Sequence, residues 1–153
     1  MSEQPSPGGG FVTKRVFDAA RERVWREWTE PQRFADWFGG PTCEVPLSTV
    51  SMDVRPGGAW RATMFCDPGH REIRWTGEYR EVSEPERLVF TISDGSDGER
   101  YELVTVVLAD LGDGRTEMHF EQRGPMRPDE YDGAKQGWGV FFDRMTERLA
   151  TGA

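Results

Sequence analysis

Hydrophobic side chains recur with helical spacing near the two ends of the chain and alternate with polar ones between them. Residues 11–17 alternate as expected for a β-strand. The pattern then predicts two short helices, the second stopping at Gly39-Gly40. The apolar faces of the two helices are formed by Val24, Trp25, Trp28, Phe34, Trp37 and Phe38.

The middle of the chain alternates with a period of two, which predicts strands separated by Gly- and Pro-rich turns. Because the turns between successive strands are short, we expect an antiparallel meander. These strands are expected at 44–54, 59–66, 71–82, 87–93, 100–109 and 115–123.

Residues 129–150 return to helical spacing and predict one long amphipathic helix. Its glycines each weaken it by up to about 1 kcal/mol relative to alanine, so packing of its apolar stripe must hold its first half. The stripe consists of Ala134, Trp138, Phe141, Phe142, Met145 and Leu149. The elements together predict an α+β fold in which a sheet faces a long C-terminal helix.

One face of the predicted sheet is apolar and rich in aromatic rings. Such a face can pack solidly against the helix or leave a cavity, and Gly77 among large rings favours a cavity. Aromatic side chains serve both purposes, so the residues alone leave both interpretations open. The inward positions include Trp60, Met64, Trp75, Tyr79, Leu88, Phe90, Val104, Val106, Met118 and Phe120.

Charge and composition narrow the class of protein. Nineteen basic against 27 acidic residues give a net charge of -8, so we expect neither nucleic acid nor a membrane surface as a partner. The longest apolar run, residues 103–109, is far below the roughly 20 residues of a membrane-spanning helix. We expect residues 1–10 to be a flexible tail and 11–150 to form a single domain.

The two cysteines, Cys43 and Cys66, have no metal-binding spacing. With no signal segment in residues 1–10, we expect a reducing cytoplasmic location and two free thiols. The two residues lie on predicted neighbouring strands, so a bridge between them stays open.

Groups that could carry chemistry are few. Glu117, His119 and Glu121 share the polar face of one strand, but a solvated face is the expected reading, and we predict no metal and no cofactor. An acid/base pair could be assembled from other strand residues, of which we expect the carboxylates on solvated faces. These residues are Glu44, Asp53, Glu78, Tyr79 and Glu102.

Five segments together resemble the bacterial relatives of the activator of the heat-shock-protein-90 ATPase, within the START-like (SRPBCC) superfamily. The resemblance implies the helix-grip fold, in which a bent antiparallel sheet of six to seven strands surrounds a long C-terminal helix. The segments are RVFDAARERVWREWTEPQRFADWFGGP (15–41), MDVRPGGAW (52–60), WTGEYREVSEPERLVFT (75–91), RTEMHF (115–120) and QGWGVFFDRMTERL (136–149).

The resemblance also implies a cavity between the sheet and the C-terminal helix. Tyr79 and Phe142, on the inward face and the helix stripe, complete our candidate ligand-binding set. Trp37 and Phe38 are expected at the mouth of the cavity. Its walls are expected to include Trp60, Met64, Trp75, Phe90, Phe120 and Trp138.

Three functions fit this scaffold. The first is non-catalytic binding of a small apolar or aromatic molecule, as a carrier or sensor, by a monomer or homodimer. The second is a polyketide cyclase or aromatase, in which Tyr79 or a carboxylate such as Glu78 moves a proton. The third is a cochaperone-type module that binds a chaperone through its acidic surface.

Overall fold

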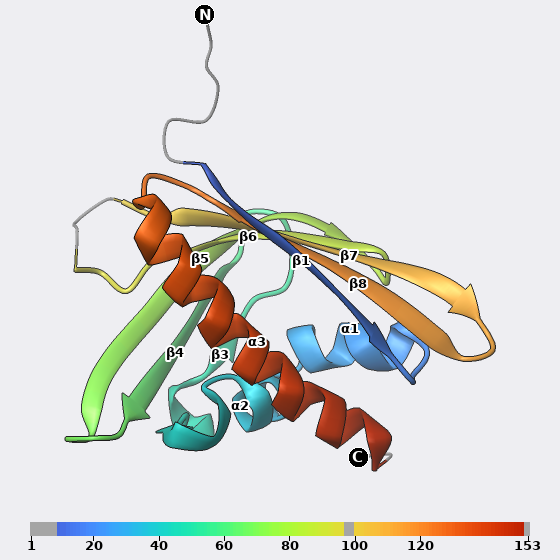
Figure 1. The fold of residues 1–153 in the computed structure, drawn as a ribbon, viewed down its shortest axis with the longest axis horizontal. Helices are drawn as coiled ribbons and strands as arrows, with labels where there is room; N and C mark the ends of the chain where they lie inside the picture. The colour runs from blue at the N-terminus through green and yellow to red at the C-terminus, as the bar shows by residue number, and fades with distance from the viewer. Residues whose placement is uncertain (1–8, 97–99, 152–153) are drawn as a thin grey trace, which may run out of the picture.

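The computed structural model describes residues 9–96 and 100–151 (Figure 1). In these residues, three α-helices and eight strands follow one another, with two 3-10 turns, η1 (Gly40–Thr42) and η2 (Leu47–Thr49). The helices are α1 (Arg21–Thr29), α2 (Pro31–Trp37) and α3 (Pro128–Ala150). The strands are β1 (Gly10–Phe17), β2 (Cys43–Glu44), β3 (Ser51–Met52), β4 (Ala59–Cys66), β5 (Arg71–Ser83), β6 (Arg87–Ile92), β7 (Glu102–Gly112) and β8 (Arg115–Arg123).

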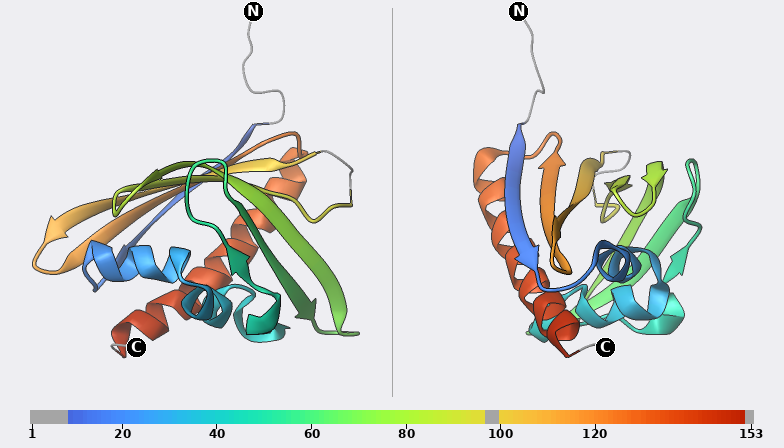
Figure 2. Two further views of the ribbon diagram at one scale, coloured as in Figure 1. Left: turned by 180° about the vertical axis from the view of Figure 1, so that it is seen from behind. Right: turned by 90° about the vertical axis from the view of Figure 1, so that its right-hand side faces the viewer.

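A strongly bent antiparallel sheet faces α3, and α1 and α2 close one end (Figure 1). The strands are hydrogen-bonded in the order β1-β8-β7-β6-β5-β4-β2, with β3 also paired to β4. In the side view of Figure 2, α3 runs beside β1 while α1 and α2 lie across the lower opening. The helix-grip architecture predicted from the sequence is confirmed.

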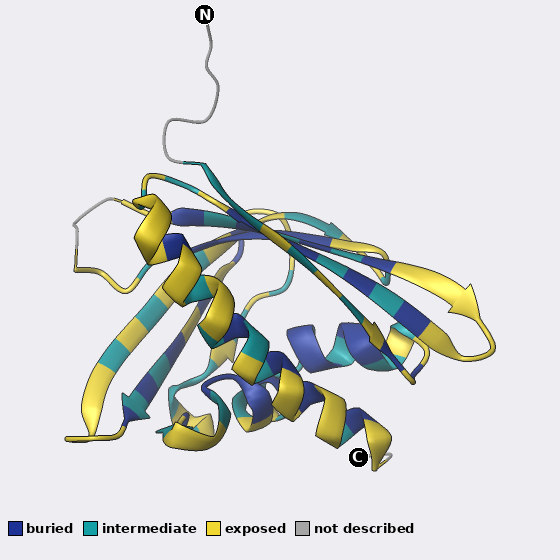
Figure 3. Cartoon of the chain, in the orientation of Figure 1, coloured by how far each residue is buried: buried dark blue, intermediate teal, exposed yellow. Residues whose placement is uncertain are grey.

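Burial follows the alternation along the strands (Figure 3). On β8, Met118 and Phe120 are fully buried, while Glu117, His119 and Glu121, which alternate with them, are partly exposed. The inner face of the sheet and the apolar stripe of α3 therefore remove each other from water, which supplies most of the driving force for the fold.

The expected strand over residues 44–54 is wrong. β2 and β3 are two-residue strands separated by η2, and both pair with β4. Pro46 has no N–H for a strand ladder, and its carbonyl instead accepts the Thr49 hydroxyl at 2.7 Å. The Thr49 oxygen in turn accepts the backbone N–H of Thr63 on β4, at 3.0 Å. A side chain thus replaces part of the missing ladder.

The start of the fold lies slightly earlier than predicted. Gly10 already belongs to β1, opposite Arg123 of β8, and the Gly9 carbonyl accepts the backbone N–H of Gly124. The rest of the expected tail, residues 1–8, lies outside the described residues, as do residues 97–99 of the turn before β7.

Cys43 and Cys66 form a disulfide, so the expectation of two free thiols is wrong. They are direct partners in the β2–β4 ladder, which brings their Cα atoms to 4.1 Å. Free thiols were expected because a reducing compartment was expected, and the cytoplasmic location stays a prediction.

Gly77 makes room for a tryptophan and not for a cavity. The indole N–H of Trp60 donates to the Thr91 carbonyl at 3.0 Å, passing over the position where a Cβ of residue 77 would lie. The Thr91 hydroxyl accepts the backbone N–H of Glu78 at 2.9 Å. Side chains thus replace ladder bonds where β5 and β6 separate.

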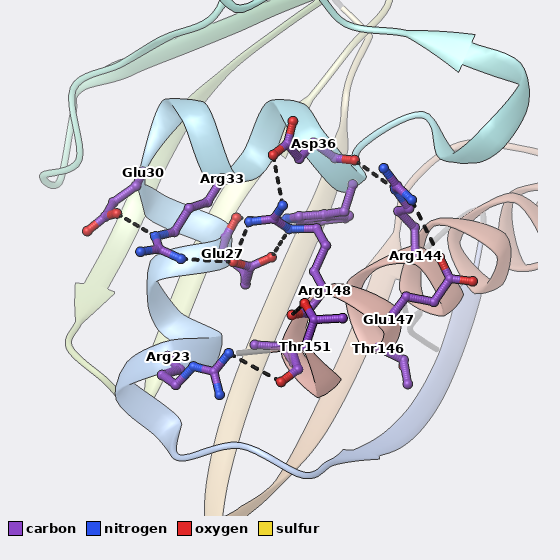
Figure 4. A network of polar contacts seen from close by, with 12 residues as sticks. Arg23, Glu27, Glu30, Arg33, Asp36, Arg144, Thr146, Glu147, Arg148 and Thr151 are labelled. Carbon is purple, nitrogen blue, oxygen red and sulfur yellow. Dashed lines mark hydrogen bonds and ion pairs between the residues drawn. The ribbon is translucent and has the colours of Figure 1, made fainter. Parts of the chain in front are cut away.

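A buried ion pair fastens α3 to the two short helices (Figure 4). Glu27 of α1 is fully buried and accepts from the Arg148 guanidinium of α3, Nε to Oε1, at 2.7 Å. Arg148 also donates to Asp36 of α2 at 2.8 Å. The hydrogen bond to Glu27, and then the charges of Glu27 and Asp36, raise the pKa of Arg148. The C-terminal half of α3 therefore has a fixed position over α1 and α2.

Candidate functional site

The aromatic core is solid under the C-terminal half of α3. The Trp28 indole lies at its centre, 4.8 Å from the Trp37 ring in an edge-on contact and about 6 Å from the rings of Phe120 and Phe142. Edge-to-face and offset contacts of this kind fill space with little void. The rings here form core and leave no room for a guest.

A cavity of about 340 Å³ lies at the other end, between the N-terminal half of α3 and the ends of β5 to β8. Its walls come from segments far apart in sequence, which only the closed fold brings together. They are formed by Phe38, Trp75, Ile92, Ser93, Asp94, Ser96, Arg100, Tyr101, Glu102, Gln122, Pro125, Met126, Glu130, Ala134, Gly137, Trp138 and Phe141.

Four rings, those of Phe38, Trp75, Trp138 and Phe141, form much of the apolar part of the wall. Phe38 stands between two of them, with centroids 6.1 Å from Trp75 and 5.8 Å from Trp138. Trp138 contacts Phe141 at 5.7 Å. Gly137, the residue before Trp138 on α3, leaves open space because nothing lies within 4 Å of where its Cβ would be. The rings therefore border the cavity and do not fill it.

A chain of hydrogen bonds forms the polar part of the wall. The Trp138 indole N–H donates to Gln122 Oε1 at 2.8 Å. This bond orients the amide, whose Nε2 donates to Glu102 Oε1 at 3.2 Å. Gln122 and Glu102 are both buried, on β8 and β7. The Trp138 ring is thereby locked at the cavity wall.

Tyr131 of α3 lies on the helix side of the same carboxylate. Its hydroxyl accepts the backbone N–H of Met126 at 3.3 Å. Burial, followed by the hydrogen bond and the charge of Glu102, raises the pKa of Tyr131 to about 12. The backbone of Gly124 lies against the carboxylate, where a Cβ would overlap Glu102 Oε2.

The expectation that Glu102 lies on a solvated face is wrong, because it is 8% exposed and lines the cavity. The alternation of inward and outward residues along β7 and β8 already indicated its burial. Glu102 continues the inward series of Val104 and Val106 on β7, and Gln122 continues that of Phe120 on β8. A polar residue that continues an inward series is expected to be buried, and a buried polar residue indicates a functional site.

Of the ten predicted ligand-binding residues, Phe38, Trp75 and Trp138 line the cavity. Met64 lies beneath Trp75, whose indole N–H donates to the Met64 sulfur at 3.5 Å. The other six are buried away from the cavity, three in the Trp28 cluster and three beside a void of about 10 Å³, room for one water at most. These six are Trp37, Phe120, Phe142, Trp60, Tyr79 and Phe90.

The other candidates for proton transfer lie elsewhere. Glu44, Asp53 and Glu78 are exposed, and Glu78 pairs with Arg80 at 2.9 Å. Tyr79 is buried at the small void, where burial and then the charge of Asp53 raise its pKa.

Within residues 9–96 and 100–151, no group of three or more metal-ligating side chains comes together. None of the helices in that part of the chain is both long and apolar enough to cross a membrane.

The bent sheet, the long helix and the cavity between them define a helix-grip protein with an internal site. The family described as activator of Hsp90 ATPase homolog 1-like protein matches residues 18–150, and the chain belongs to this family. The family resemblance inferred from the sequence is confirmed. No curated protein sequence matches the chain.

Solved structures support the same fold. The AHSA1 protein from Silicibacter pomeroyi is 17% identical with a TM-score of 0.82, over 94% of this chain and 99% of that one. A protein from Chromobacterium violaceum is 24% identical with a TM-score of 0.78, over 91% and 95% of the two chains. CalU16 from Micromonospora echinospora is 20% identical with a TM-score of 0.64, over 89% and 73%. Identities this low establish the fold alone.

Proposed function

We propose that the protein is a non-catalytic carrier or sensor that binds a small, flat hydrophobic or aromatic molecule between its sheet and α3. The observation that carries this proposal is the cavity of about 340 Å³ walled by Phe38, Trp75, Trp138 and Phe141. Pockets that hold small molecules are mostly apolar with a few placed polar groups, and this cavity has that composition.

The size of the cavity limits the guest. Ligand pockets span roughly 300–1,000 Å³, so this one is at the lower end and suits a molecule of one or two rings. Binding would draw on about 25 cal/mol for each Å² of apolar surface buried. Because the hydrogen bonds of Gln122 already hold the Trp138 indole, little side-chain ordering would oppose binding.

The ten residues predicted from the sequence divide into two roles under this proposal. Phe38, Trp75 and Trp138 would contact the ligand, with Phe141 added from the structure. The other seven would support the walls from the core side.

Filling the cavity tests the proposal. In Gly137→Leu the new side chain would enter the open space beside Trp138, and affinity for 2-naphthylmethanol, a neutral two-ring probe, is expected to fall more than about tenfold. Isothermal titration calorimetry measures this affinity. The matched control is Gly133→Leu, on the same helix, with equal space for a Cβ but outside the cavity wall.

Both substitutions replace a helical glycine and should raise stability by up to about 1 kcal/mol, so loss of folding cannot mimic loss of binding. Equal affinity in the parent chain and in Gly137→Leu would contradict the proposal, and so would the absence of binding by the parent chain.

The alternatives have less support at this cavity. Tyr79 and Glu78, the residues predicted to move a proton in a cyclase, lie outside its walls. Chaperone binding rests on the family name and on the net charge of -8, neither of which identifies a surface. Both stay predictions.

A further inference from the structure

We propose that the ligand carries a positive charge: an aromatic or apolar amine whose ring system lies among the four rings and whose cationic nitrogen meets the carboxylate of Glu102. This inference rests on the proposed function, since it specifies which small molecules the cavity would select.

The position and the surroundings of Glu102 support this inference. Its side chain lines the cavity although the residue is 8% exposed. Its Oε1 accepts a hydrogen bond from the amide of Gln122, a neutral group. A neutral donor satisfies an oxygen lone pair without supplying a positive charge, and attraction between opposite charges is stronger in this buried position than in water. A cation bound there would gain more than it would from a carboxylate in water.

The packing around Glu102 fixes the place of this charge. Gly124 leaves the space that the carboxylate occupies, and a side chain at that position would displace it. Gln122 is oriented by Trp138, so its Nε2 faces Glu102. The carboxylate and the Trp138 ring therefore border the same cavity through one hydrogen-bonded chain, and a cation at Glu102 can also approach the face of an aromatic ring.

The remaining charges of the wall have the same sign on balance. Among the described residues of the wall, the carboxylates of Asp94, Glu130 and Glu102 stand against one guanidinium, that of Arg100. Arg100 donates to the Pro125 carbonyl at 3.0 Å. Hydrogen bonds from the Ser96 hydroxyl and backbone N–H lower the pKa of Asp94, which keeps it charged at neutral pH. The net charge of -8 also attracts cations to the opening.

Three probes of one shape and different charge test the inference on the full chain at neutral pH: 2-naphthylmethylamine, 2-naphthylmethanol and 2-naphthoate. We expect the amine to bind at least about tenfold more tightly than the carboxylate, with the alcohol between them. In Glu102→Gln, which keeps an acceptor oxygen for the Gln122 amide, the ratio of amine to carboxylate affinity should fall to about twofold or less.

The control is Glu130→Gln, at an exposed wall residue, which should keep most of the preference. If all three probes bind equally to the parent chain, the inference is wrong and the proposed function stands. If none binds, the proposed function fails as well. A preference that survives in Glu102→Gln, with folding verified by thermal denaturation, would also overturn the role given to Glu102.

Discussion

The Tyr131 side chain, in the first turns of α3, is buried, and burial together with the nearby carboxylate of Glu102 raises the pKa of its hydroxyl. Because this hydroxyl is removed from water beside a carboxylate, its neutral form is favoured in the folded state. Unfolded tyrosine titrates near pH 10, whereas the pKa of Tyr131 is raised to about 12. The stabilisation is thus fully present below about pH 10 and is lost as the pH rises toward 12.

We therefore expect the free energy of unfolding to fall between about pH 10 and 12, and to fall less steeply in Tyr131→Phe, which has no ionisable hydroxyl there. Tyr79, whose pKa is also raised, contributes the part of the decline that remains. Urea unfolding over this range measures the effect, and Tyr101→Phe, at an exposed tyrosine, is the control. A decline of equal slope in Tyr131→Phe and the parent chain would refute this assignment.

At the scale of single residues, the alternation of hydrophobic and polar positions predicted which side chains of the strands point inward. It did not predict that polar side chains among them would line the cavity. The alternation correctly predicted that Val104, Val106 and Phe120 are buried. Glu102 and Gln122 follow the same period, yet their burial depends on partners from three elements, Trp138 among them. No spacing within a single strand encodes such a partnership.

At the scale of the elements, the Glu27–Arg148 pair determines how α3 sits on α1. Glu27→Ala would leave a guanidinium that is 13% exposed without its closest partner, so we expect a loss of about 3 kcal/mol, with Asp36 compensating in part. Urea unfolding provides the measurement.

Glu72→Ala is the matched control, because it removes a carboxylate from an exposed pair with Arg74 on β5. Such surface pairs contribute about 0–1 kcal/mol. Equal losses in Glu27→Ala and Glu72→Ala would contradict the role assigned to the buried pair.

The long elements were predictable and the short ones were not. The repeated stripe of α3 defined that helix to within a residue or two, and β4 was predicted with its observed bounds. β2 and β3 contain two residues each and exist only through pairing with β4, so no local period marks them. The disulfide was missed for the same reason, since it depends on the register of β2 against β4.

At the scale of the whole molecule, the sequence left open whether the aromatic rings pack solidly or surround a cavity, and the structure contains both arrangements. Aromatic rings fill the core around Trp28 and also border a cavity beside Trp75 and Trp138. Composition could not separate these two uses. In Figure 2, β4 and β5 bend away from the rest of the sheet, and α1 and α2 lie between the sheet and the C-terminal half of α3.

The six tryptophans allow a direct test of the central claim, that a small molecule binds in this cavity and not elsewhere in the core. Each indole N–H gives one signal in a two-dimensional 1H–15N NMR spectrum, which tryptophan-to-phenylalanine variants assign. On titration with 2-naphthylmethylamine, the account predicts the largest shifts for Trp75 and Trp138, which line the cavity. Largest shifts at Trp28 and Trp60, or no shift at saturating probe, would contradict it.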